Sequence, residues 1–171
     1  MVPFFETITD FVAKGGPVIP IILLLALALW TLVAERYLFF RWVYPQMRRQ
    51  WLAHWQQRSD KHSWYAHRVR ETLISQARQQ MGKTMPLIKT LVSLSPLLGL
   101  LGTVTGMIHM FDAMAVFGTG NPRAMATHIS HATLPTLAGM TIAIAGLYFS
   151  QRLEHRVEAE TRHLSDNLHF D

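Results

Sequence analysis

Residues 95–111 read SPLLGLLGTVTGMIHMF, and this stretch decides the fold. It is apolar enough to lie in lipid, yet it holds a proline, three glycines, two threonines and a histidine. Glycine and proline weaken an isolated helix, whereas small residues on a membrane helix let a second helix approach closely. The stretch therefore predicts a membrane-spanning helix with a closely packed neighbour.

The composition of the whole chain also points to a membrane. Half of its 171 residues are hydrophobic, only 16% are charged, and cysteine is absent. Without cysteine there is no disulfide framework and no thiolate site. The formal net charge of +5 does not indicate a nucleic-acid partner, because ten of the sixteen basic residues lie in one segment, from Arg36 to Lys83.

Three segments are long and apolar enough to cross a hydrocarbon core of about 30 Å, which takes roughly 20 helical residues. The sequence therefore predicts an all-α integral membrane protein with three transmembrane helices and long cytoplasmic helical extensions. The expected order is a periplasmic N-terminal segment (1–17), transmembrane helix 1 (18–38), a cytoplasmic helical loop (39–88), transmembrane helix 2 (89–117), a short periplasmic loop (118–128), transmembrane helix 3 (129–150) and a cytoplasmic C-terminal helix (151–171).

The orientation follows from the positions of the basic residues. Cytoplasmic loops are rich in lysine and arginine, and the segment after the first span is the basic one here. A cleaved signal peptide is the alternative for the first span, since Ala26-Leu27-Ala28 looks like a cleavage site. Cleavage would leave the basic loop outside, and Lys14 is the only basic residue before the span, so we expect a retained span with its N-terminus outside.

Small residues form one face on each of the second and third spans. Such faces allow close helix packing in lipid, where no hydrophobic force draws helices together. Pro96 and Pro135 would loosen their helices locally, which a neighbouring helix or water can compensate. The two faces consist of Ser95, Gly99, Gly102, Gly106 and Ala113 on the second span, and Ala132, Thr136, Gly139, Ala143 and Gly146 on the third.

Hydroxyl groups recur on the same two spans. Thr103 and Thr105 lie near the middle of the second span, and Thr133, Thr136 and Thr141 lie in the outer half and centre of the third. Threonine in a membrane helix often bonds back to its own helix carbonyls. Several threonines on adjacent helices can instead line a narrow wet path, and both readings stay open at this point.

Ionisable residues are costly in a bilayer and are therefore candidates for function. His109, Asp112 and His131 lie towards the outer ends of the spans, and Glu35 marks the inner end of the first. No carboxylate lies at mid-depth, so a proton-conducting role would need an acid from a partner helix. His128 and His131 lack a clear third ligand, so we expect no metal site and no cofactor.

The cytoplasmic segments show no sign of an enzyme. They contain no nucleophile–base pair, carboxylate dyad or phosphate-binding loop, and the loop is too short for a sizeable core of its own. An intermittent apolar stripe follows the third span and predicts packing against the loop or a neighbouring subunit. Its members are Phe149, Leu153, Val157, Leu164 and Leu168.

The motifs resemble those of the MotA/TolQ/ExbB proton channel family. SPLLGLLGTVTGMIHMF and the later ISHATLPTLAGMTIAIAGLYF are similar to its two pore-forming spans, and AERYLFFR is similar to its Glu-Arg junction after the first span, here Glu35 and Arg36. The short chain and modest loop resemble a short ExbB subunit of a TonB system. The resemblance implies a homo-pentamer in the bacterial inner membrane around an ExbD-like subunit, whose transmembrane aspartate carries the proton.

The resemblance also assigns roles to individual residues. Thr103 and Thr136 fall where the family has its pore threonines, and Thr133 lies beside them on the expected pathway. Five residues before the second threonine the better-known ExbB pattern has a glutamate, whereas this chain has His131. A histidine, with an ordinary pKa near 6.5, can change charge near physiological pH, unlike a glutamate. His131 is therefore a candidate for the proton pathway, and the outer entrance need not work as it does with the glutamate.

The resemblance implies a proton-driven motor subunit that energises a TonB-like protein for uptake across the outer membrane, for example of an iron-siderophore. A TolQ-like subunit for envelope integrity is an alternative within the family. A non-conducting membrane scaffold is the alternative from another class, in which the small-residue faces only assemble other subunits.

Overall fold

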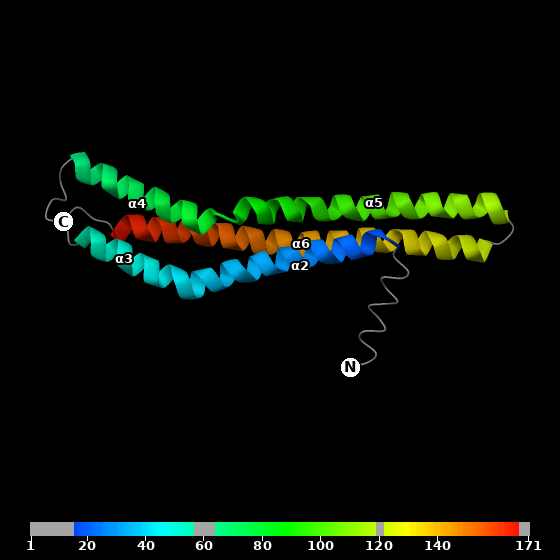
Figure 1. The fold of residues 1–171 in the computed structure, drawn as a ribbon, viewed down its shortest axis with the longest axis horizontal. Helices are drawn as coiled ribbons and strands as arrows, with labels where there is room; N and C mark the ends of the chain where they lie inside the picture. Colours follow the sequence, from blue (N-terminus) through cyan, green and yellow to red (C-terminus); the bar gives the residue numbers. More distant parts are fainter. Residues whose placement is uncertain (1–15, 57–63, 119–121, 168–171) are drawn as a thin grey trace, which may run out of the picture. The chain divides into compact units, whose positions relative to one another are not determined.

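The computed structural model describes residues 16–56, 64–118 and 122–167, and within these ranges it contains helices and no strand (Figure 1). The all-α prediction is confirmed. Three helical stretches, Val18–Ala53, Trp64–Val116 and Ile129–Asn167, are long and apolar enough to cross a membrane. The elements are α2 (Val18–Leu38), the π-helix η1 (Phe39–Val43), α3 (Tyr44–Gln56), α4 (Trp64–Gly82), α5 (Met85–Phe117) and α6 (Pro122–Asn167).

Some of the predicted segments lie outside the described residues. These are most of the periplasmic segment 1–17, residues 57–63 of the loop, residues 119–121 between the second and third spans, and the end of the apolar stripe at Leu168. The helices are longer than the predicted spans, because α5 begins at Met85 and α6 begins at Pro122 and continues to Asn167. The span boundaries and sidedness stay predictions.

The turn after α5 depends on a glycine. Gly118 has a φ of 75°, and its N–H donates to the Met114 carbonyl at 2.9 Å. This is the left-handed conformation that commonly ends a helix and that residues with a side chain rarely adopt. Pro122 then opens α6, where its missing N–H costs nothing because the first helical N–H groups have no partner within the helix. In the first unit α6 runs alongside α5 (Figure 1).

The helices α5 and α6 each contain an internal proline. Pro96 lies within α5 and Pro135 within α6, and each helix continues through its proline. Proline lacks the N–H that would bond the carbonyl four residues earlier, which frees the carbonyls of Val92 and His131 from that bond. The close packing described below surrounds these two interruptions.

By contact density the chain forms two compact units, and each is described by itself. The first unit contains residues Met1–Trp30 and Thr90–Leu147, and the second contains Thr31–Lys89 and Tyr148–Asp171. The first unit therefore holds the small-residue faces of the second and third spans. The second holds the Glu35-Arg36 pair, α3, α4 and the C-terminal part of α6.

The apolar stripe of α6 forms part of the core of the second unit. Leu153, Val157 and Leu164 are buried there. Polar contacts tie the same helix to the preceding segments: Arg70 donates to the Ser165 carbonyl at 2.8 Å, and Lys89 pairs with Glu154 at 2.7 Å. The C-terminal helix thus packs against the predicted loop, at Arg70, and against the first residue of the predicted second span, Lys89.

Tyr44 makes the folding stability of the second unit depend on pH in the alkaline range. Its side chain is 4% exposed, and its hydroxyl lies 3.4 Å from the Glu160 carbonyl. Burial, with a smaller effect from the Glu160 carboxylate, raises the pKa of Tyr44 from 10.0 to about 12. Because the folded protein favours the protonated phenol, this contribution to stability is complete below pH 10.0 and is lost as the pH rises to about 12.

We therefore expect the unfolding temperature of the purified protein to fall between pH 10.0 and about 12, and to fall less steeply in Tyr44→Phe. Tryptophan fluorescence measures the unfolding, and absorbance of the phenolate follows the titration. The exposed Tyr65 provides the control, since Tyr65→Phe should keep the wild-type slope. A wild-type slope in Tyr44→Phe would contradict the assignment.

Candidate functional site

The first unit is built on a close antiparallel contact between α5 and α6 (Figure 1). A methyl group on Gly102 would lie 2.3 Å from Cβ of Pro135, and one on Gly106 would lie 2.7 Å from Cβ of Ala132. Such distances leave no room for a side chain on either glycine. The absence of a Cβ at these positions is therefore what allows the two helices to approach.

Around Gly139 the backbones of the two helices themselves meet. A methyl group there would lie 2.5 Å from the Ser95 carbonyl oxygen and 3.1 Å from Cα of Gly99. On the other helix, a methyl group on Gly99 would lie 3.0 Å from Cα of Thr136. The obstructing atoms belong to the backbone, so they cannot rotate away. Ser95, Gly99 and Gly139 thus form a backbone-to-backbone contact between the two spans.

The N-terminal part of α2 covers one side of this helix pair. Ile19, Ile22 and Leu29 are buried, and a methyl group on Gly146 would lie 2.9 Å from a terminal carbon of Leu29. Near the other end of the unit, Val18 lies 3.5 Å from the position of a methyl group on Gly102. The first span therefore packs along the glycine-lined contact.

The opposite side of the pair carries the predicted pore threonines. Successive residues of a helix are turned by about 100° around its axis. Around the axis of α5, Thr103 therefore lies about 40° from the direction of Gly99. Around the axis of α6, Thr136 lies about 60° from the direction of Gly139, in the same sense. In antiparallel helices these rotations point to the same side. Thr133 is rotated further that way and is exposed. We call this side the open face, defined by Thr103, Met107, Thr133, Thr136 and Met140.

The threonines of the open face differ in their hydrogen bonds. Thr103 donates to the Leu100 carbonyl at 2.7 Å and Thr133 donates to the Ser130 carbonyl at 2.8 Å, each within its own helix. Thr136 instead donates across the contact to the Gly99 carbonyl of α5 at 2.9 Å. One hydroxyl therefore ties the two spans together beside their backbone contact.

The structure separates His131 from the threonines. His131 is half-buried and, eight residues before Gly139, is rotated about 80° in the sense opposite to Thr136. The half-buried residues Leu134, Ala138 and Ile142 lie on that same side of α6. The geometry therefore brings Thr103, Thr133 and Thr136 to one face and leaves His131 outside it.

Arg36 forms a second site, at the end of the first span. Its side chain is 3% exposed, donates from Nη1 to the Gln80 carbonyl at 3.1 Å and donates from Nε to the Thr84 hydroxyl. The guanidinium also lies 5.0 Å from the centre of the Phe39 ring. Gln80 belongs to the last turn of α4, where the helix dipole favours a cation. The charge is thus compensated by carbonyl, hydroxyl and ring.

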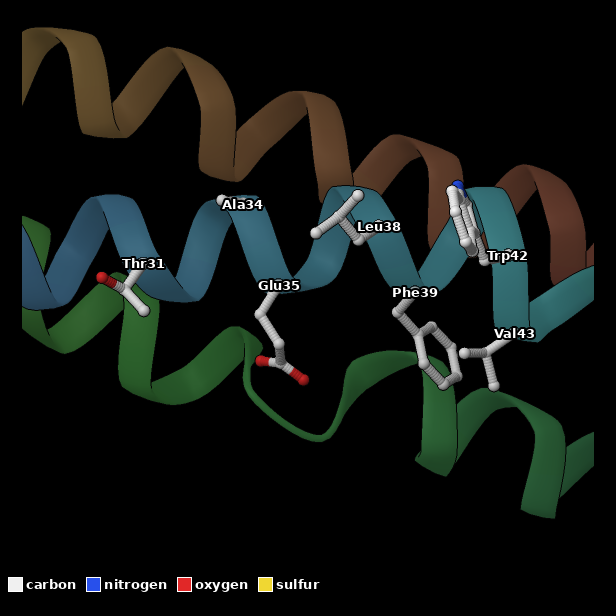
Figure 2. Close-up of a pocket in the computed structure, with 7 residues that line it drawn as sticks. All are labelled: Thr31, Ala34, Glu35, Leu38, Phe39, Trp42 and Val43. Carbon is white, nitrogen blue, oxygen red and sulfur yellow. The ribbon is translucent and has the colours of Figure 1, made fainter.

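Glu35, the neighbour of Arg36, points elsewhere. It is exposed and lines an open apolar groove of about 740 Å³ along α2 and η1. Figure 2 shows Glu35, Phe39 and Val43 projecting from one side of the helix. Trp42, also on the groove, is 70% exposed. The groove is lined by Thr31, Ala34, Glu35, Leu38, Phe39, Trp42 and Val43.

Sequence reasoning missed several features of these sites. The partners of Arg36 lie more than forty residues away in the sequence, and no local pattern identifies them. Met107 and Met140 read as ordinary apolar residues, although both lie among the threonines and are exposed. Their rotation from Gly99 and Gly139, at about 100° per residue, is the signal that could have placed them.

The chain is similar to a family of known proteins. The sequence model of the MotA/TolQ/ExbB proton channel family matches residues 43–166. The chain is 44% identical over 64 residues to the putative biopolymer transport protein ExbB-like 1 of Synechocystis sp., covering 36% of this chain and 25% of that protein. It is 32% identical over 98 residues to the biopolymer transport protein exbB1 of Vibrio cholerae, covering 57% and 43% respectively.

A relative from the Tol-Pal system is similar to a comparable degree. The Tol-Pal system protein TolQ of Haemophilus influenzae is 32% identical over 81 residues, which cover 47% of this chain and 36% of that protein. The matches thus span less than half the length of each of these relatives. Since the family match extends over most of the chain and includes both helices of the open face, this multi-pass membrane protein belongs to the MotA/TolQ/ExbB proton channel family.

Proposed function

We propose that this protein is the ExbB-like subunit of an inner-membrane motor that couples proton flow to TonB-dependent uptake across the outer membrane. The single observation that carries the proposal is the open face, where hydroxyl groups of two packed spans lie on the side away from α2. No acidic side chain of the described residues lies on this face. An acid on a partner helix would complete a proton path.

The same geometry supports an assembly around that partner. In a homo-pentamer with the open face inwards, Thr103, Thr133 and Thr136 of every copy would surround the transmembrane aspartate of an ExbD-like subunit. The α2 helices would then lie outside, with the N-terminus periplasmic and the basic segment cytoplasmic. We place His131 beside the outer entrance. The mechanical work that proton flow supplies would be passed on to a TonB-like protein.

The energy of proton flow sets a scale for this coupling. One charge crossing 100 mV gains about 2.3 kcal/mol, so several protons are needed for substantial mechanical work. Methionine side chains between the threonines are flexible and adapt to changing contacts. The open face therefore suits an inner helix that moves between similar positions in small steps.

A TolQ-like role in envelope integrity is the second candidate, because the chain is similar to a TolQ protein as well as to ExbB proteins. A deletion strain separates the two. Loss of growth under iron limitation with normal detergent resistance supports the uptake motor. Detergent sensitivity with normal iron-limited growth supports the TolQ-like role.

The variant Thr136→Val tests whether the open face conducts. Valine keeps the shape but removes the hydroxyl, so we expect proton flux and iron-limited uptake to fall about tenfold or more while complex levels stay normal. A hydrogen bond between membrane helices contributes only about 0.6 kcal/mol on average, which is too little to prevent assembly. Proton flux is measured in vesicles that contain the purified complex.

Thr141→Val is the matched control. Thr141 lies on the same helix but bonds its own Leu137 carbonyl and is rotated well away from the open face. We expect proton flux in Thr141→Val to stay within about threefold of the wild type, which is the scale of one average hydrogen bond in a membrane. Wild-type flux in Thr136→Val would favour the scaffold, in which the threonines only pack.

A further inference from the structure

A small pocket in the second unit lies between the end of α2 and the part of α6 around the end of the predicted third span. It has a volume of about 250 Å³ and is lined by Val33, Tyr37, Phe149, Arg152, Leu153 and Arg156. Val33 and Leu153 are buried, whereas both arginines are exposed. The pocket thus combines an apolar wall with two cationic groups.

The two arginines have uncharged partners. Arg152 donates to the Tyr148 hydroxyl at 3.1 Å, and the Arg156 guanidinium lies 5.4 Å from the Phe40 ring centre and 5.9 Å from that of Tyr37. Among the described residues, no carboxylate forms an ion pair with either arginine. Within the part of the chain that the structure describes, the pocket therefore presents two positive charges without an ion-pair partner.

The nearby acids of α6 are engaged elsewhere. Glu154 pairs with Lys89 at 2.7 Å, Glu158 pairs with Arg162 at 3.6 Å, and the Glu160 carboxylate lies at the Tyr44 hydroxyl, whose pKa it helps to raise. A zwitterionic headgroup would need a carboxylate or an aromatic cage for its cationic end. Glu154 and Glu158 already have basic partners, and the Tyr37 ring already faces Arg156. The charge of the pocket thus favours a ligand that is purely anionic.

The position of the pocket identifies the source of the anion. Arg152 follows two residues after Ser150, the last residue of the predicted third span, and Tyr37 lies at the end of the first. Tyrosine is enriched at membrane–water interfaces, and basic pockets between membrane helices on the cytoplasmic side bind anionic headgroups. Arginine also binds phosphate with two parallel hydrogen bonds.

We propose that this pocket binds an anionic phospholipid, whose phosphate lies between Arg152 and Arg156 and whose acyl chain lies along Val33 and Phe149. The bound lipid would fasten the end of the first span to the start of the C-terminal helix. This inference depends on where the spans end and not on proton conduction, so it can fail while the proposed function holds.

The test uses the purified complex of this protein and its partner subunit in neutral detergent. The unfolding temperature is followed by tryptophan fluorescence during titration with phosphatidylglycerol, phosphatidylcholine or inorganic phosphate. We expect only phosphatidylglycerol to stabilise the wild type at micromolar concentrations. In Arg152→Gln with Arg156→Gln, the apparent affinity should fall about 30-fold, or roughly fivefold for each arginine lost.

The control carries the same loss of charge at other sites of the second unit. Arg68 and Arg162 are exposed and pair with acids of their own helices, so Arg68→Gln with Arg162→Gln should keep the wild-type affinity. Replacing Arg152 and Arg156 by lysine should retain most of it, because lysine binds phosphate as a point charge. This lysine pair also decides the matter if the glutamine pair fails to assemble.

Three results would overturn the proposal. They are an unchanged affinity in the glutamine pair, equal stabilisation by phosphatidylcholine, and equal stabilisation by inorganic phosphate. The last would assign the pocket to a soluble anion. A normal proton flux in the wild-type complex, measured in parallel, keeps a negative result here separate from a failure of the motor.

Discussion

Gly139→Ala is expected to lower the stability of the assembled protein by about 3 kcal/mol, at the upper end of the usual range for overpacking. The added methyl carbon would lie 2.5 Å from the Ser95 carbonyl oxygen and 3.1 Å from Cα of Gly99. Both are backbone atoms, so α5 and α6 must move apart. Separation would also stretch the hydrogen bond from Thr136 to the Gly99 carbonyl.

The consequence extends to the open face. Thr103 and Thr136 lie on one side only because their helices meet at the glycines, so moving the helices apart displaces the hydroxyls. We therefore expect Gly139→Ala to lower proton flux as well as the unfolding temperature. The flux assay and the fluorescence-monitored unfolding of the purified complex measure both effects on one preparation.

Gly82→Ala is the matched control, since a methyl group there would meet no atom within 4 Å. Gly82 has an ordinary helical backbone, so alanine should leave stability unchanged or raise it by up to about 1 kcal/mol. Comparing the two glycine-to-alanine variants thus separates the effect of helix packing on stability from the effect of alanine's higher helix propensity. If both variants unfold at the wild-type temperature, the inference that the backbones of α5 and α6 are in contact at Gly139 is wrong.

The long helices were predictable because hydropathy and the absence of helix breakers are local properties. The apolar stretches around SPLLGLLGTVTGMIHMF required helices, and glycines at steps of three and four residues indicated a packing face. The π-helix at residues 39–43 was not predicted, and Phe40 within it and Tyr44 directly after it are buried in the second unit.

The partners of individual side chains could not be predicted from the sequence. The sequence does not distinguish the threonines at 103, 133 and 136 from one another. Of these three, only Thr136 donates a hydrogen bond to the other span. The difference depends on the register of α5 against α6, and one residue of slip would change it. His131 shows the same limit, because the side that α2 covers depends on contacts between distant segments.

Arg36→Ala is expected to destabilise the second unit by about 3 kcal/mol, since hydrogen bonds from a charged donor contribute about 1.5–3 kcal/mol and the truncation also leaves a cavity. The guanidinium is 3% exposed and bonds the Gln80 carbonyl and the Thr84 hydroxyl. Its loss would leave those acceptors without their donor and release the end of α4 from α2. Thermal unfolding of the purified complex measures the effect.

Arg41→Ala is the control, because Arg41 lies on the adjacent π-helix but is exposed. It removes the same charge near the same end of the predicted first span, so we expect a change within about 0.5 kcal/mol, as for most surface substitutions. Comparable losses in both variants would mean that the positive charge at this end of the predicted span matters, and not the buried contacts of Arg36.

Arg36→Met separates the two contributions to the stability lost in Arg36→Ala, which are the hydrogen bonds and the filled space. Methionine fills much of the space of the arginine stem but donates no hydrogen bond, and a buried ion can often be replaced by an apolar residue of similar volume at little cost. The charge of Arg36 is compensated by a helix terminus, a hydroxyl and the Phe39 ring, so we expect methionine to recover less than half of the stability lost in alanine. Full recovery would show that Arg36 acts by filling space, and that the bonds to Gln80 and Thr84 add nothing to the junction.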